Sequence, residues 1–408
     1  MSDVRVLVTG GEYFGGLAAI RALARSGHQT WAAIVDENSY AARSRAAAGA
    51  VVVPDPATGA LRFAEAVSTE AKRLGAQVVL PGTDLALTAL AAHADAFPPM
   101  IALGVCSSQV VERATAKAAL TDLAAAAGFA VPPTRQITRF DMDAEEGIDF
   151  TFPAVVKPVR SDVPNRNGTL VHRPVMPIKN AAELRAVVDQ SEGDEWLVQP
   201  FLEGELVAVA GVAWEGTIVA AVHQVAQRIW PSRCGGSSYA MTVTPDEGRA
   251  QKVVRLVDDL AWSGIFQVQL LRSRTEDYLI DFNPRFYGTL ALALAAGVNL
   301  PALWVEMLIG KQPQASFAYR SGVRYRAQLK DLRAIALLFR SGAWSRACRG
   351  LLPRPGTSHP VFAWNDPLPT LAGWSRVRRR VRPAIAGVVQ GADPLSKRLT
   401  RMAKHRRN

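Results

Sequence analysis

The sequence predicts a mixed α/β protein in which a parallel α/β layer precedes a larger α+β region built on antiparallel sheet, with a basic extension at the C-terminus. Up to residue 105, short aliphatic runs alternate with Ala-rich helical segments. Between residues 134 and 288, strand-like runs follow one another with two helical segments among them. Of the 408 residues, 49% are hydrophobic and 20% are charged, so the chain has enough apolar surface to fold and global disorder is excluded.

The N-terminal unit begins with the aliphatic run Val4–Val8, continues through Thr9-Gly10-Gly11 and ends in the apolar-periodic segment Leu17–Ala24. This order is typical of a strand, a glycine turn and a helix, the first half of a βαβ unit. Ligands of such parallel sheets bind beyond the carboxyl ends of the strands. Four more short runs predict the remaining strands of the layer: Thr30–Val35, Ala50–Val53, Gln77–Leu80 and Met100–Leu103.

The glycine turn at residues 10–16 has two interpretations. Glycines between a strand and a helix can let a phosphate approach the helix N-terminus. However, the spacing is not G-x-G-x-x-G, and Asp36, the nearest acidic candidate for a ribose contact, lies in a polar loop. A tight structural turn is therefore favoured over a dinucleotide site.

The pattern changes after residue 113. A helix is predicted over Ala116–Ala127, and Gly128 followed by Val131-Pro132-Pro133 ends it. Two further helices are predicted over Ala181–Gln190 and Asp246–Trp262. The runs that predict strands in this region are Phe152–Val156, Trp196–Gln199, Leu206–Val212, Ile218–Val225, Ile265–Leu271 and Tyr278–Phe282. The apolar stretch 290–309 contains Gly297, Pro301 and Glu306, and it predicts two short buried helices rather than a membrane span.

Charge and cysteine content exclude several classes of protein. Of the net charge of +11, residues 371–408 contribute +10 through 11 Lys/Arg and one acid, which leaves +1 for residues 1–370. Cys106, Cys234 and Cys348 form no C-x-x-C pair, so neither a disulfide framework nor a structural zinc site is predicted. No basic segment leads into a long apolar core at the N-terminus, so no signal peptide is predicted and a reducing, cytoplasmic location is expected.

The first chemical motif is Asp281-Phe282-Asn283-Pro284-Arg285, which directly follows an apolar strand. Strand alternation places Asp281 and Asn283 on one face, where paired oxygens suit a hard divalent cation. Gln269 offers a third oxygen from the preceding strand, and Arg285 lies one step further along, suited to an anionic oxygen. A simple turn is the alternative interpretation, because Asp, Asn and Pro are common at strand ends.

The second motif is a lysine at the end of an aliphatic strand, Lys157 in the segment 152–158. An isolated lysine at such a position is usually solvated. Two other features accompany this one: Lys117 opens the helix before the Pro-Pro boundary, and the strand at 196–199 leads into a polar hinge at residues 200–205.

In chain order the four features are Lys117, Lys157, the strand and hinge at residues 196–205, and the motif at residues 281–285. Together they resemble the ATP-grasp superfamily, especially its biotin carboxylase and carbamoyl phosphate synthetase branch. The resemblance covers about residues 4–310. It implies a pre-ATP-grasp α/β domain at residues 1–110 and a two-subdomain ATP-grasp fold at 111–315, with a lid subdomain at about 134–200. Residues 316–408 are then a C-terminal extension with a basic tail. The implied cofactors are ATP and Mg²⁺, with Mn²⁺ as a substitute for Mg²⁺.

The resemblance also implies a role for each matching residue. Lys117 and Lys157 hold ATP phosphates, and Arg285 binds the acyl phosphate or a substrate oxyanion, so Lys157 and Arg285 are the catalytic candidates. The metal ligands are Gln269, Asp281 and Asn283. The adenine hinge and the ribose contact are assigned to Gln199, Pro200, Phe201, Leu202 and Glu205. The substrate side is assigned to Arg233, Gly235, Gly236, Ser237 and Arg285.

Two features depart from the family's pattern. The family usually carries Glu where this chain has Asp281, whose side chain is shorter by one methylene. The lid loop after Lys157 is normally rich in glycine, whereas residues 160–168 contain only Gly168. Arg160 and Arg166 can supply charge to phosphates there in place of backbone N–H groups.

The predicted function is an ATP-dependent, ADP-forming ligase that activates a carboxylate as an acyl phosphate and joins it to an amine. Two alternatives stay open: a catalytically silent nucleotide-binding protein tethered by its basic tail, and a small-molecule kinase. The expected partners are ATP and small-molecule carboxylates and amines. No aromatic residue follows Trp374, which disfavours single-stranded nucleic acid as a partner of the tail. Peripheral contact of the tail with an anionic membrane, and a homodimer, are left open.

Overall fold

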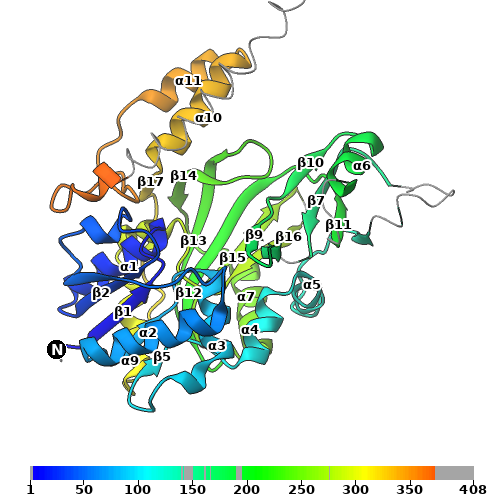
Figure 1. Ribbon diagram of the computed structural model, residues 1–408. Coiled ribbons are helices and arrows are strands. Elements are labelled where there is room, and N and C mark those ends of the chain that lie inside the picture. Colours follow the sequence, from blue (N-terminus) through cyan, green and yellow to red (C-terminus); the bar gives the residue numbers. More distant parts are fainter. Residues whose placement is uncertain are drawn as a thin grey trace, which may run out of the picture.

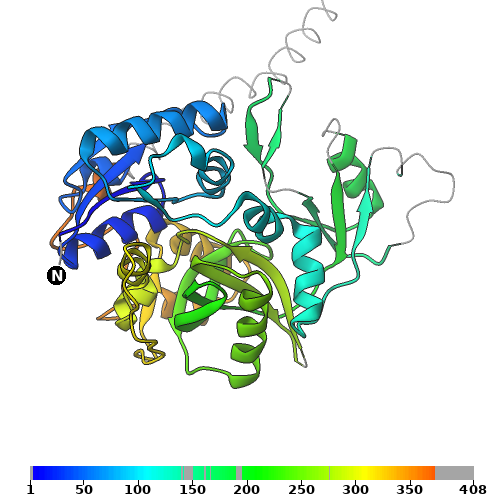
Figure 2. The ribbon, with the colours of Figure 1, turned by 90° about the horizontal axis from the view of Figure 1, so that it is seen from below.

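The computed structural model describes residues 3–138, 141, 150–159, 162–165, 167–189, 195–274 and 276–372. Three sheets form its framework. Figures 1 and 2 place a parallel five-stranded sheet at one end of the molecule, a four-stranded antiparallel sheet at the other, and a six-stranded antiparallel sheet between them. The predicted fold class, a parallel α/β layer followed by an α+β region, is confirmed.

The N-terminal sheet has the strand order β3-β2-β1-β4-β5, and all its strands are parallel. Val6, Leu7 and Val8 have no exposed surface, as expected for a strand covered by helices on both faces. The strands are β1 (Arg5–Thr9), β2 (Gln29–Ile34), β3 (Gly49–Val52), β4 (Val78–Leu80) and β5 (Ala102–Leu103). The helices of this layer are α1 (Phe14–Arg25), α2 (Ala60–Leu74) and α3 (Asp84–Ala92).

The six-stranded sheet has the order β16-β15-β12-β13-β14-β17, and its neighbouring strands are antiparallel. One face packs against α1 and the helices α8 (Leu290–Ala296) and α9 (Leu300–Leu308). The other face packs against α4 (Ser108–Thr115), α5 (Lys117–Ala126) and α7 (Glu247–Asp259). Its strands are β12 (Glu205–Trp214), β13 (Thr217–Trp230), β14 (Gly236–Thr242), β15 (Gly264–Arg272), β16 (Asp277–Asn283) and β17 (Arg324–Arg326).

The four-stranded sheet has a small core of its own, to which Val156, Leu184 and Trp196 belong. The strand order is β10-β7-β11-β6, with β6 (Arg135–Ile137), β7 (Ala154–Pro158), β10 (Met176–Ile178), β11 (Trp196–Pro200) and one helix, α6 (Ala181–Asp189). A separate two-stranded hairpin, β8 (Asp162–Pro164) and β9 (Leu170–His172), lies between the second and third strands of this sheet in the sequence, β7 and β10.

The apolar stretch 290–309 forms α8 and α9, two buried helices that meet at 94°. Within the described part of the chain, no single helix has the length and hydropathy of a membrane span; this bent pair passes the same test by length and composition alone. The prediction of two short buried helices is therefore confirmed. After β17 the chain forms α10 (Gln328–Arg340) and α11 (Trp344–Leu351), and the basic tail from residue 376 lies outside the described residues.

Gly15 and Gly16, in the first turn of α1, are packing residues. A Cβ added at Gly15 would lie 2.8 Å from the carbonyl carbon of Phe286 and 2.9 Å from the Tyr287 nitrogen. A Cβ added at Gly16 would lie 2.4 Å from the carbonyl oxygen of Gly10. These contacts support the interpretation of a tight structural turn, and they set the N-terminal layer directly against the segment that follows Arg285.

We expect replacement of Gly15 by alanine to lower the free energy of unfolding by about 1–3 kcal/mol, because the new methyl group meets backbone atoms that cannot rotate away. Gly248 is the matched control, since it is likewise the second residue of a helix. A Cβ added there would meet its nearest neighbour, Asp246 Oδ1, at 3.7 Å. Denaturant unfolding of the two variants checks this prediction. Equal changes in both would contradict the packing role of Gly15.

Candidate active site

The predicted metal ligands lie on one face of the six-stranded sheet. Gln269 on β15 is paired directly opposite Asp281 on β16, and Gln267 is paired opposite Asn283. The alternate residues Phe266, Val268 and Phe282 point into the core on the other face. The period of two therefore presents three oxygen-bearing side chains, Gln269, Asp281 and Asn283, to the same side of neighbouring strands.

A buried chain of hydrogen bonds fixes the amides beside this group. Gln269 Nε2 donates to Gln267 Oε1 (3.1 Å), and Gln267 Nε2 donates to Thr289 Oγ1 (3.0 Å). Gln224 Nε2 donates to the same hydroxyl at 2.9 Å. Because the amide nitrogen of Gln269 is held by this network, its oxygen is the atom directed away from Gln267. This orientation suits a cation ligand.

Two lysines lie at the same site. Lys157, on β7, is 8% exposed, and Lys117, the first residue of α5, donates from Nζ to the carbonyl oxygen of Pro158 at 3.0 Å. Burial and then the neighbouring charge of Lys117 lower the pKa of Lys157 to about 8, while Asp281 acts in the opposite direction. Burial also lowers the pKa of Lys117, whereas the negative charges of Asp281, Asp162 and Asp84 raise it.

Two ammonium groups held together away from water repel each other, and an anion placed between them relieves that repulsion. Asp281 alone does not do this. Burial, and then the negative charge of Asp84, raise the pKa of Asp281, whereas the positive charges of Lys117, Arg285 and Lys157 lower it. The site is therefore electrostatically suited to a polyanion that arrives with a cation.

Arg285 follows β16 and reaches across to the N-terminal layer. Its Nη2 and Nε donate to the two carboxylate oxygens of Asp84, at 2.8 and 3.1 Å, and its Nη1 donates to the carbonyl oxygen of Phe286 at 3.2 Å. Asp84 is the first residue of α3, just beyond the carboxyl end of β4, and Thr83 caps that helix. The guanidinium is thus held in one orientation by a bidentate pair.

Sequence reasoning missed Asp84. The segment 81–84 directly follows β4, and ligands of parallel sheets bind beyond the carboxyl ends of the strands. That rule, applied to each strand end in turn, identifies Asp84 as a candidate, although it cannot name Arg285 as its partner.

The hairpin β8–β9 adds a second residue that sequence reasoning missed, Asp162. Asp162 Oδ1 lies 3.4 Å from His172 Nδ1, and this hydrogen bond raises the pKa of His172. Leu170 donates its backbone N–H to the carbonyl oxygen of Ala57 in the N-terminal layer (2.9 Å), so the hairpin contacts that layer. Arg160 and Arg166, which the sequence offers as phosphate contacts, lie outside the described residues.

The predicted adenine hinge begins on β11, the strand that pairs with β7. Gln199 is buried and donates from Nε2 to Thr134 Oγ1 at 2.7 Å. Gln199 is two residues along from Leu197, which is paired with Lys157, so hinge and lysine lie on adjacent strands. Phe201 donates its backbone N–H to the carbonyl oxygen of Pro153 at 3.0 Å. The guanidinium carbon of Arg233 lies 5.5 Å from the centre of the Phe201 ring.

The remaining predicted residues lie at or beside the ends of strands. Pro200 ends β11 and Leu202 follows it, whereas Glu205 begins β12 and forms an ion pair with Arg272 near the surface, so its carboxylate already has a partner. Gly235 precedes β14, and Gly236 and Ser237 begin it, opposite Trp230 and Ile229. The structure therefore brings together Lys117, Lys157, Gln269, Asp281, Asn283 and Arg285, and it leaves Glu205 engaged elsewhere.

The donor set fits a hard divalent cation. Within residues 3–372, apart from the segments left undescribed, no three His, Cys, Asp or Glu side chains gather closely enough to hold a metal ion. A cation here would rest on one carboxylate, Asp281, and on the amide oxygens of Gln269 and Asn283. Such a set binds Mg²⁺ with the help of substrate phosphates rather than alone.

Comparisons with known proteins identify the fold that carries these residues. The family described as "ATP-grasp in the biosynthetic pathway with Ter operon" matches residues 192–330. The L-amino acid ligase from Bacillus licheniformis is similar in structure, with a TM-score of 0.59 and 13% identity over 76% of this chain and 75% of that one. A biotin carboxylase from Campylobacter jejuni is also similar in structure, with a TM-score of 0.60 and 12% identity over 79% of this chain and 74% of that one.

The N5-carboxyaminoimidazole synthetase from Staphylococcus aureus, solved as a complex with ADP, gives a TM-score of 0.60 and 12% identity over 84% of this chain and 86% of that one. At such identities the similarity establishes the fold alone. The fold is that of ATP-grasp proteins, as the sequence resemblance implied.

Proposed function

We propose that this chain, which belongs to the ATP-grasp superfamily, is a ligase that uses ATP to activate a carboxylate and joins it to an amine. The observation that carries the proposal is the convergence of Lys117, Lys157, Asp281 and Arg285 at one site. These residues come from α5, β7, β16 and the segment after β16. A buried lysine and a partly buried one beside an oxygen-ligand set suit a triphosphate, and the arginine beyond them suits the transferred group.

In the proposed reaction, a carboxylate oxygen of the substrate attacks the γ-phosphorus of ATP, and ADP leaves. The amine then attacks the carbonyl carbon of the acyl phosphate, and phosphate leaves with that same oxygen. Lys117 and Lys157 would fix the phosphate oxygens, and Arg285 would stabilise the acyl phosphate. When bound, Mg²⁺ on Gln269, Asp281 and Asn283 would neutralise charge that develops on the phosphates.

Release of ADP across panels of carboxylates, with and without amines, tests this proposal. A ligase requires both substrates for sustained turnover and transfers ¹⁸O from a labelled carboxylate to inorganic phosphate. A phosphorylated product that forms without amine, and retains the label, would instead identify a kinase. Binding of ATP without ADP release under any condition would identify a silent nucleotide-binding protein.

Replacement of Asp84 by asparagine is expected to lower kcat about tenfold while it leaves the Kd for ATP nearly unchanged, because it loosens Arg285 and not the phosphate contacts. Asp84→Glu should restore part of the loss, since it keeps the charged partner. The control is Asp95→Asn, the same change at an exposed position of the same layer. A rise in the Kd for ATP that accounts for the whole defect would contradict this role.

A further inference from the structure

The helix pair α10–α11, here called the C-terminal hairpin (residues 328–352), projects from the body of the molecule (Figure 1). It exposes large apolar side chains on both helices. Leu329 and Leu332 of α10 are 47% and 48% exposed, and Trp344 of α11 is 64% exposed. Leu351 and Leu352 at the end of α11 are 48% and 58% exposed. Residues 329 and 332, and residues 344 and 351, are spaced so that each pair shares one face of its helix.

The same region is strongly basic. Residues 332–364 contain five arginines and no acidic residue. All five are exposed: Arg333, Arg340, Arg346, Arg349 and Arg354. The chain then continues into residues 373–408, which carry 11 Lys/Arg and one acid. Leu329, Arg333 and Arg340 therefore share the exposed face of α10, whereas Arg346 and Arg349 lie on the opposite side of α11 from Trp344 and Leu351.

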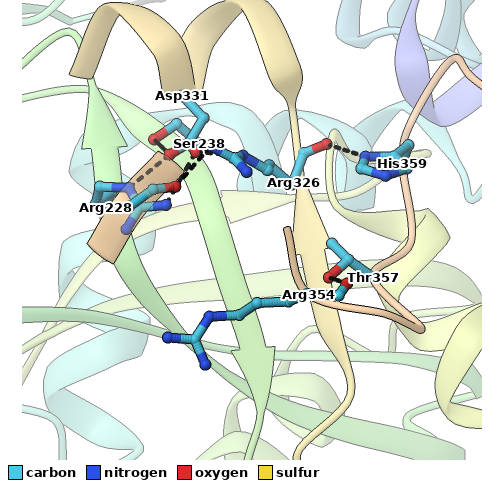
Figure 3. A network of polar contacts seen from close by, with 8 residues as sticks. Arg228, Ser238, Arg326, Asp331, Arg354, Thr357 and His359 are labelled. Carbon is cyan, nitrogen blue, oxygen red and sulfur yellow. Dashed lines mark hydrogen bonds and ion pairs between the residues drawn. The ribbon is translucent and has the colours of Figure 1, made fainter. Parts of the chain in front are cut away.

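The nearest acidic residue does not offset this charge, because it anchors the hairpin to the sheet (Figure 3). Asp331 is fully buried, and its carboxylate accepts from Arg228 Nε and Arg326 Nε, both at 2.6 Å. Arg326 also donates from Nη2 to the carbonyl oxygen of Gly350 in α11, at 2.8 Å. Both helices are thereby fixed to β13 and β17, so the exposed side chains stand on a firm support.

We propose that the C-terminal hairpin docks on an anionic lipid surface. A pair of helices that exposes Trp and Leu together with a face that combines leucine and arginine is typical of segments that lie in a membrane interface, where apolar side chains enter the acyl boundary and cations meet headgroups. A nucleic acid would use the arginines but not the exposed leucines. The charge of residues 373–408 adds attraction to the same kind of surface.

Co-sedimentation of the full chain with vesicles tests the proposal. One set is phosphatidylcholine alone, and the other contains phosphatidylglycerol as well. We expect binding to the anionic vesicles only, and a steep loss of binding as salt is raised. The double variant Trp344→Ser/Leu351→Ser should bind these vesicles about tenfold more weakly, since it removes the side chains that insert. Arg333→Glu/Arg340→Glu should lose a comparable amount through charge, because these arginines share the exposed face of α10 with Leu329.

The matched control is Met100→Ser, which removes an apolar side chain that is 81% exposed in the N-terminal layer; it should bind as the parent does. Parental binding by the Trp344/Leu351 variant would overturn the proposal, whether the arginine variant is affected or not. Failure of the parent protein to bind either type of vesicle would also overturn the proposal. If that parent is a dimer by light scattering and the Trp344/Leu351 variant a monomer, the hairpin is an interface between copies of the chain. Unchanged thermal unfolding of the variants establishes that they are folded.

Discussion

Replacement of Asp281 by asparagine is expected to reduce ATP-dependent turnover by a factor of about a hundred to a thousand, the largest effect of any single change in this site. Asp281 is the one carboxylate among the three proposed cation ligands, and an amide in its place removes a full negative charge from the cation site. ADP release at saturating ATP, measured over a range of Mg²⁺ concentrations, checks the prediction. Additional Mg²⁺ should restore only a small part of the activity.

Asn283→Ala is the comparison variant, because it removes a neutral ligand from the same strand face. Its loss should be smaller, about tenfold, as expected for one neutral contact. Asp281→Asn should not lower stability at neutral pH. Burial and Asp84 raise the pKa of Asp281, so its charged form is unfavourable in the free protein, and asparagine removes that charge at nearly constant shape. Equal and mild losses of activity in both variants would instead indicate a structural turn at residues 281–285.

The part of the site that lies on strands could be predicted from the sequence. Alternate residues of a strand share a face whatever the rest of the chain does, so Asp281 and Asn283 had to point the same way. The antiparallel hairpin then placed Gln269 opposite Asp281. The same local logic predicted the long strands β12, β13 and β15, whose apolar runs are nearly unbroken because both faces are covered.

Contacts between distant segments could not be predicted in this way. Arg285 and Asp84 are 201 residues apart in the sequence, and only the packing of the N-terminal layer on the central sheet brings them together. Gly15 is part of that packing, since a side chain there would push the layer away from residues 286 and 287. Local patterns singled out Arg285 and the glycines at residues 10–16, but they did not single out Asp84 and contained no information about which partner each residue meets.

Glu205 shows that a residue close to a motif in the sequence can have a partner outside that motif. Its position next to the hinge suggested a ribose contact, whereas in the structure it is paired with Arg272 across two neighbouring strands. Opposite charges directly across an antiparallel pair stabilise each other modestly, by about 0.2–1 kcal/mol. That small energy is enough to orient an exposed side chain, so nearness in sequence to a motif does not establish a role in it.

Replacement of Lys157 by alanine is expected to lower turnover by about a hundredfold, because a cation that holds phosphate oxygens in a water-poor site contributes several kcal/mol to the transition state. The fold should survive, since the charged form of this buried lysine is disfavoured beside Lys117 in the free protein. Parental ADP release by a folded Lys157→Ala variant at saturating substrate would refute the phosphate role.

The pH dependence of ATP binding provides an independent check on Lys157. Its pKa of about 8 leaves the ammonium form dominant at pH 7, and the side chain loses its proton, and with it the attraction for phosphate, as the pH rises through 8. The Kd for ATP, measured by calorimetry, should therefore rise between pH 7 and pH 9.5, by at most about tenfold for each pH unit above 8. Lys157→Arg keeps its charge over this whole range and should flatten the profile. If the arginine variant shows the same rise as the parent, the titrating group is another one, and Lys117 becomes the first to test.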